Sequence, residues 1–151
     1  STPTNFCIGV SGYPEKHFEA PNRQTDMENL KAKVESGASY IVTQMFFENK
    51  KFFRFRDECR EIGINVPVIA GLKPISALND INLLPQTFHI DVPNDLVTAI
   101  RKCSTDKEAR EVGIEWATMQ SKELIKEGVP GIHYYTLGRS DNIARIVKEA
   151  F

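Results

Sequence analysis

The sequence predicts an α/β fold built on a parallel sheet, because short apolar runs alternate with helical patterns along its 151 residues. Runs rich in β-branched and aromatic residues predict four buried strands, at residues 6–10, 40–47, 66–72 and 131–137. Continuous apolar runs of this kind are typical of parallel strands covered on both faces. Four such units make half of an eight-stranded βα barrel, and an open four-stranded parallel sheet is the alternative.

Helical patterns separate these strands, with apolar residues spaced three and four apart. The predicted helices span residues 24–36, 49–62, 76–83, 94–102, 105–127 and 139–150. Thr105 followed by Glu108 is typical of a capping box and predicts the start of the longest helix. Glycines end three helices where a strand follows, at Gly37, Gly63 and Gly128. The element order predicts one domain of right-handed parallel units.

Composition excludes several classes of function. The net charge of −1 and the scattered basic residues disfavour nucleic acid and anionic membrane surfaces as partners. No apolar run approaches the length of a membrane helix, and the first residues lack a signal-peptide pattern, so we expect a soluble, cytoplasmic protein. Cys7, Cys59 and Cys103 are far apart, and the histidines lack metal-ligand spacing, which disfavours disulfides and a metal site. Phosphate-binding loops and nucleophile elbows are also absent.

In βα folds, the chemistry lies at the carboxyl ends of the strands. The loop after the first predicted strand carries Tyr13, His17 and the carboxylates Glu15 and Glu19. A tyrosine ring can pack on a flat ligand, and a histidine can donate to a phosphate. The alternative interpretation is a solvated polar loop.

The helix after this loop carries a second polar group. Asp26, Asn29 and Lys33 are spaced three and four apart and so share one face. Asp26 and Asn29 could accept hydrogen bonds from ribose hydroxyls, and Lys33 could meet a phosphate. An ordinary exposed polar face is the alternative.

Gln44 interrupts the second apolar run, and a buried amide needs hydrogen-bond partners. It could pair with the polar edge of a heterocycle or serve as a structural hydrogen bond, and both interpretations stay open. Tyr135 and Arg139 end the fourth run, where the arginine could hold a carboxylate. For Arg139, and for Lys73 after the third run, the alternative is a surface ion pair. We expect His89 and His133 to be structural.

In order and spacing, these segments resemble the methylenetetrahydrofolate reductase family. Residues 13–20, YPEKHFEA, resemble its Y-P-E-x-H-x-E-A segment, and residues 43–47 resemble its T-Q-x-F-F segment. Further matches in register lie at residues 26–38, 54–57, 67–74 and 133–139. The resemblance implies a TIM barrel of the (β/α)8 type, of which residues 1–151 form a single partial domain. This chain would cover about the last four βα units, the C-terminal half.

The resemblance also implies reduction of 5,10-methylenetetrahydrofolate to 5-methyltetrahydrofolate, with FAD and NAD(P)H as cofactors. It assigns FAD to six residues, namely Tyr13, His17, Ala20, Asp26, Asn29 and Lys33. It assigns the folate and nicotinamide to Gln44, with Arg139 and Tyr135 in the same substrate site. This chain departs from the family at Gly138, Asp80 and Ala32, where the family carries asparagine, glutamine and arginine.

The family's general-acid glutamate belongs to the N-terminal half of the barrel. We therefore expect no catalytic acid in this chain and expect the isolated piece to be inactive. Its expected partner is that N-terminal half or a second copy of the chain. The alternative is a non-catalytic half-barrel or assembly domain of the same ancestry.

Overall fold

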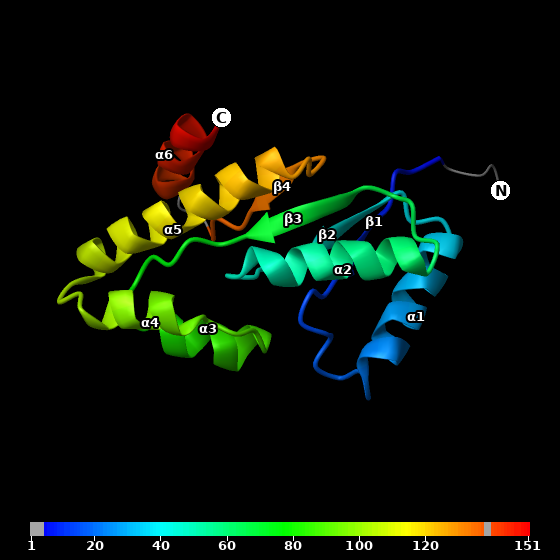
Figure 1. The fold of residues 1–151 in the computed structure, drawn as a ribbon, viewed down its shortest axis with the longest axis horizontal. Coiled ribbons are helices and arrows are strands. Elements are labelled where there is room, and N and C mark those ends of the chain that lie inside the picture. The colour runs from blue at the N-terminus through cyan, green and yellow to red at the C-terminus, as the bar shows by residue number, and fades with distance from the viewer. Residues whose placement is uncertain (1–4, 138–139) are drawn as a thin grey trace.

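The computed structural model describes residues 5–137 and 140–151, and a four-stranded parallel sheet forms its centre (Figure 1). The strands follow one another across the sheet in chain order. Their bounds are β1 Gly9–Gly12, β2 Tyr40–Thr43, β3 Val68–Leu72 and β4 Ile132–Tyr134. All neighbouring pairs are parallel, which confirms the predicted α/β class and matches part of a βα barrel.

Each predicted helix is present. The helices are α1 Arg23–Glu35, α2 Asn49–Glu61, α3 Asp80–Phe88, α4 Asn94–Arg101, α5 Asp106–Lys126 and α6 Asp141–Ala150. The capping box of α5 is confirmed: Thr105 Oγ1 accepts from the Glu108 amide at 3.2 Å, and the Glu108 carboxylate accepts from the Thr105 amide. The predicted helix-ending glycines have φ values of 116°, 85° and 74°. Within the described ranges, none of the helices has the length and apolarity needed to cross a membrane.

Several predicted boundaries are wrong. The second and fourth strands were predicted to end at residues 47 and 137, but β2 ends at Thr43 and β4 ends at Tyr134. The first strand was predicted at residues 6–10, but β1 lies further along, because its pairing runs from Gly9 with Tyr40 to Gly12 with Thr43. The third helix was predicted at 76–83 but spans α3 instead. Its earlier residues form a turn whose backbone amides donate to the Asp80 carboxylate, so they cannot continue the helix.

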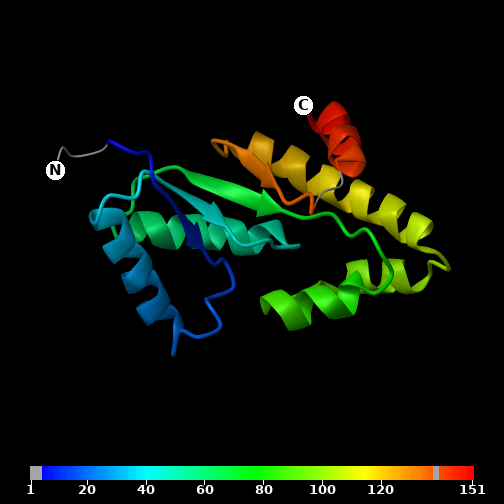
Figure 2. The same ribbon diagram turned by 180° about the vertical axis from the view of Figure 1, so that it is seen from behind.

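The two faces of the sheet differ in cover. On one face, Ile41, Ala70 and Leu72 are fully buried beneath α2 and α5, which cross the sheet in Figure 1. On the other face, Val42 and Ile69 are only half-buried. Figure 2 views the strands from that side, where no helix of the described chain lies over them. Alternating side chains therefore divide the sheet into a packed face and an open face.

A second apolar cluster joins α3, α4 and α5 beside the carboxyl end of β3. Leu84, Leu96 and Ile100 fill it and are almost fully buried. The expectation that Phe46 and Phe47 belong to the core is confirmed, since their exposed fractions are 1% and 2%. The long excursion between β3 and β4 is therefore a packed helical layer that supports the strand ends.

Candidate functional site

A cavity of about 410 Å³ lies beside the carboxyl end of β1, between the following loop and α1. All six residues that the family resemblance assigned to FAD line it, namely Tyr13, His17, Ala20, Asp26, Asn29 and Lys33. The prediction that three of these share one face of α1 is confirmed. Ser11, Gly12, Glu19, Pro21 and Leu30 complete the lining, and the sequence analysis did not assign them to the site. Two separate polar groups of the sequence thus meet in one place.

Asp26 is buried, so the interpretation of the α1 stripe as an ordinary exposed face is wrong at this position. One oxygen of its carboxylate, Oδ2, accepts from the backbone amide of His17 at 3.0 Å. This bond ties the loop to the helix. The Lys33 side chain makes no ion pair with any described residue, so its ammonium can serve a ligand.

The loop between β1 and α1 is held by its own contacts. Lys16 adopts a left-handed backbone with φ of 81°, and its ammonium donates to the carbonyls of His17 at 2.9 Å and Ala20 at 2.6 Å. The ring of Tyr13 meets that of His17 edge to face, with 4.5 Å between centroids. Phe18 stacks on His89, which gives His89 the structural role that we expected. These hydrogen bonds and ring contacts hold the loop in one conformation.

Arg23 is the main residue of this region that the sequence analysis missed. Its Nη1 donates to the Tyr13 carbonyl at 2.6 Å, and its Nε donates to Glu58 of α2 at 2.7 Å. The guanidinium also lies over the Phe55 ring at 5.5 Å. A cation in the first turn of a helix opposes the helix dipole, and this was the available signal that Arg23 has partners elsewhere.

Burial would raise the pKa of Glu58, but hydrogen bonds and charge from Arg23 and Arg54 outweigh it and hold this pKa below its usual value. A carboxyl group whose pKa is lowered by folding stabilises the folded state at pH values above its unfolded pKa of 4.5. This stabilisation is lost as the pH falls through the folded pKa. We predict that Glu58→Gln lowers the free energy of unfolding at pH 7 by about 1 kcal/mol. The difference should vanish in acid.

Urea unfolding of the full chain at pH 7 and at pH 3 measures this difference. Glu61→Gln is the matched control, because Glu61 is exposed on the same helix and forms no ion pair with a described residue. A loss for Glu58→Gln that is equal at both pH values would contradict the prediction.

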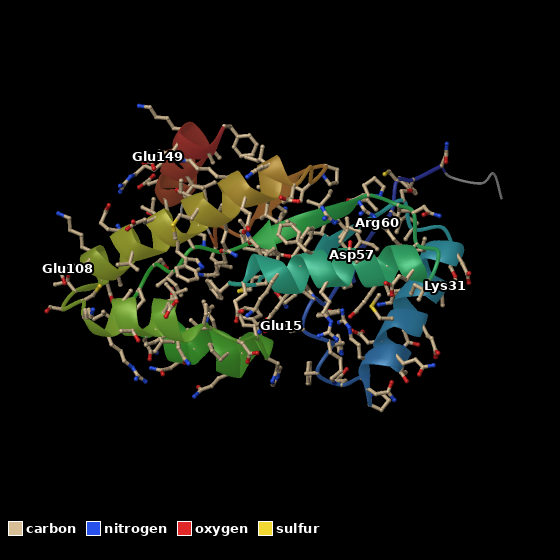
Figure 3. All side chains as sticks on the ribbon, viewed as in Figure 1. Glu15, Lys31, Asp57, Arg60, Glu108 and Glu149 are labelled. Atoms are coloured by element: carbon tan, nitrogen blue, oxygen red, sulfur yellow. The ribbon has the colours of Figure 1, made fainter. Side chains whose placement is uncertain are left out.

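Glu15, labelled in Figure 3, is not part of the cavity lining and ties the loop to two other elements. Its Oε1 accepts from Lys51 Nζ at 2.6 Å and from the Asp91 amide at 3.0 Å. Lys51 also donates to the Asp91 carboxylate at 2.8 Å. Burial raises the pKa of Glu15, whereas the Lys51 hydrogen bond lowers that of Asp91. The cluster joins the loop to α2 and to the connection between α3 and α4.

Of the predicted substrate residues, Gln44 follows β2 and Tyr135 follows β4, so they lie on either side of the end of β3. The Gln44 side-chain oxygen accepts from the Met45 amide at 3.0 Å, and its amide nitrogen has no acceptor within the described chain. The Tyr135 hydroxyl donates to the Thr43 carbonyl, one residue before Gln44, at 2.8 Å. Burial, and then the nearby Tyr13, raise the pKa of Tyr135, which keeps the phenol protonated as a donor. Arg139 and Gly138 lie outside the described residues.

The surface ion pair considered for Lys73 is wrong, because only 7% of this residue is exposed. Its Nζ lies 3.7 Å from an oxygen of Asp80, which is also buried. Asp80, one of the three residues that depart from the family pattern, is therefore paired with Lys73 in the structure. Of the other two departures, Ala32 is exposed on α1.

Metal and thiol chemistry receive little support from the described residues. No cluster of histidine, cysteine or carboxylate side chains there could hold a metal ion. Burial raises the pKa of Cys59 to about 12, which leaves it a protonated core residue. Cys7 is exposed and Cys103 is partly buried, and neither forms a disulfide.

The lining of the large cavity fits a nucleotide. A buried carboxylate and an amide can accept from ribose hydroxyls, and an unpaired ammonium suits a phosphate. The volume of about 410 Å³ falls within the range of small-molecule sites. The neighbouring tyrosine and histidine rings add apolar surface for a flat group.

Comparison with known proteins matches this arrangement to one family. Residues 1–150 match the family described as methylenetetrahydrofolate reductase. The chain is 38% identical over 138 residues to the 5,10-methylenetetrahydrofolate reductase of Pectobacterium carotovorum, covering 91% of this chain and 46% of that protein. It is 35% identical over 145 residues to a probable methylenetetrahydrofolate reductase (NADPH) of Caenorhabditis elegans, covering 95% of this chain and 22% of that protein.

A solved structure from Clostridium thermocellum shares the fold, with a TM-score of 0.60 and 16% identity. The match covers 95% of this chain and 52% of that one, an uncharacterized protein described as binding two copies of 5-methyl-5,6,7,8-tetrahydrofolic acid. The chain thus spans about half the length of its bacterial relative and of this structure. The match over residues 1–150 places the chain in the methylenetetrahydrofolate reductase family.

Proposed function

We propose that this chain is the C-terminal half of the barrel of a methylenetetrahydrofolate reductase. The proposed enzyme reduces 5,10-methylenetetrahydrofolate to 5-methyltetrahydrofolate with hydride from NADH or NADPH. The observation that carries the proposal is the convergence of the six family-matched residues on one cavity of nucleotide character. The six cavity residues would hold FAD, and the bound flavin would supply the hydride-transfer chemistry between the nicotinamide and the folate.

The residues of this chain would bind and orient the reactants. Asp26 and Asn29 would accept hydrogen bonds from the ribose hydroxyls, and Lys33 would meet the phosphates. The free amide nitrogen of Gln44 would donate to the pterin or to the nicotinamide, which take turns beside the flavin. Tyr135 holds the backbone next to Gln44, and Arg139 would bind a carboxylate of the folate tail.

The open face of the sheet is evidence that another polypeptide segment covers it. Half-buried apolar residues such as Val42 and Ile69 line it, and β1 and β4 are the end strands of the described sheet. We propose that the N-terminal half of the barrel covers this face and supplies the acid glutamate. A second copy of the chain is the other candidate. The folate bound by the Clostridium thermocellum protein, which has the same fold, also supports a folate substrate.

Anaerobic half-reactions test the proposal. The full-length product of the gene should carry a flavin that NADH or NADPH bleaches and that 5,10-methylenetetrahydrofolate reoxidises. The isolated chain should support neither half-reaction, because the catalytic acid and half of the barrel are supplied by the partner. A flavin that is bleached but not reoxidised by the folate would contradict the proposed substrate. Turnover by the isolated chain would contradict the proposed division of the barrel.

A further inference from the structure

A second cavity, of about 130 Å³, lies where β3 and β4 end, and it is distinct from the cavity beside α1. Lys73 and Ser76 line it from the β3 side, and Tyr135 lines it from the β4 side. Asn142, at the start of α6, adds an amide. Within the described chain, Lys73 is the cation of this lining.

The ammonium of Lys73 is buried without a full set of acceptors. It carries three N–H donors, and the structure shows one hydrogen bond, to the Pro74 carbonyl at 3.3 Å. The nearest Asp80 oxygen is 3.7 Å away, which is an ion-pair distance but is too long for a good hydrogen bond. Buried donors without partners cost free energy, so this ammonium is suited to bind an acceptor.

Asp80 balances the charge of Lys73 but cannot satisfy its donors. Its Oδ2 accepts from the Ser76 amide at 2.8 Å, the Ser76 hydroxyl at 3.2 Å and the Ala77 amide at 3.2 Å. These three bonds fix the carboxylate in the turn before α3. The pair therefore presents a positioned N–H donor of low net charge to the cavity.

The strand register places Lys73 on the open face of the sheet. Leu72 pairs with Tyr134, and the Tyr135 amide donates to the Leu72 carbonyl at 2.9 Å, so Lys73 lies beside Tyr135. The Tyr135 ring lies against Gly71, where a Cβ would come within 2.9 Å of it. Residues 71 and 73 share one face by strand alternation. Lys73 thus lies at the same end of the sheet as the proposed substrate residues.

We propose that Lys73 binds the substrate, donating a hydrogen bond to an oxygen acceptor of the folate. This inference rests on the proposed function. The acceptor is either a carbonyl of the pterin or a carboxylate of the glutamate tail, which share the chemistry that an ammonium recognises. Asp80 is a positioning residue, because it acts through Lys73 and the turn.

Titration of the full-length gene product with 5-methyltetrahydrofolate tests this role. Lys73→Met should weaken folate binding by about 10- to 100-fold, the range expected for a lost charge-assisted hydrogen bond. Lys73→Gln keeps an N–H donor and should lose less. Lys50→Met is the matched control, because the Lys50 side chain is 80% exposed and pairs only with Glu48 among the described residues. Flavin content should be equal in all variants, which shows that each has folded.

A folate analogue without the glutamate tail separates the two acceptors. If the tail is bound, Lys73→Met should not affect binding of the analogue, and if the pterin is bound, the full loss should remain. Both results support the proposal. Unchanged folate affinity in Lys73→Met, with the wild type binding folate normally, would overturn this inference alone. A wild type that binds no folate would overturn it together with the proposed function.

Discussion

Replacing Lys33 with methionine is expected to weaken FAD binding by about 10-fold, because a charge-assisted hydrogen bond to a phosphate is lost. Lys33 lines the cavity on the last turn of α1 and has no ion-pair partner in the described chain. The bond is expected at the lower end of the usual range, since Lys33 is exposed and water screens its charge.

Lys31 provides the matched control for this variant. It lies on the same helix, pairs with Glu35 at 3.8 Å and lies on the outer side of α1, away from the loop after β1 (Figure 3). Lys31→Met should change FAD affinity by less than about twofold, because its surface pair is weak and remote from the cavity. Flavin fluorescence titration at low and high salt measures the FAD affinity of both variants. Equal losses in the two variants would show that general charge, rather than this cavity, attracts the cofactor.

Gly113→Ala is expected to lower the free energy of unfolding by about 2–3 kcal/mol, the usual cost of overpacking a core. Gly113 lies within α5, where a Cβ would stand 2.0 Å from the Ile75 carbonyl oxygen. The clash is with backbone, so no side-chain rotation can relieve it. At an exposed helical position, the same change would add about 0.8–1 kcal/mol of stability, so the expected sign is reversed.

Gly131→Ala is the control, since the nearest atom to its Cβ would be an Ile69 methyl at 4.0 Å. The free energy of unfolding of this variant should lie within about 0.5 kcal/mol of the wild-type value. Urea unfolding of the full chain measures both variants. Gly113→Ala should also weaken folate binding, because Ile75 follows Lys73 closely in the displaced segment. A neutral or stabilising effect of Gly113→Ala would contradict the close packing of α5 on this segment.

Local periodicity was enough to predict the described helices other than α3 to within about two residues, and one face of the site. Asp26, Asn29 and Lys33 recur at helical spacing, and such spacing fixes a shared face whatever the helix packs against. The capping residues Thr105 and Glu108 lie within one turn, so their pattern predicted a contact that the structure confirms. These features depend on near neighbours in the sequence.

Other features depend on contacts between distant segments and have no local pattern. Arg23 reaches Tyr13 across the loop and Glu58 on the next helix, and nothing within α1 specifies either partner. From the sequence alone, Lys73 resembles a surface lysine. In the structure, the turn at Asp80 and the end of β4 enclose it. Gly113 matters because of the backbone of Ile75, which the sequence does not place beside α5. The ends of the strands likewise depend on where neighbouring strands pair, and not on the extent of the apolar runs in the sequence.

We expect the cavity between α1 and the loop after β1 to bind FAD, and the flavin content of the full-length gene product measures whether it does. The purified protein should show a flavin absorption spectrum and release FAD on denaturation in an amount equimolar with the chain. Adding FAD to stripped protein should restore the spectrum. A colourless protein that takes up no FAD would contradict the assignment of the cavity and, with it, the proposed reductase activity.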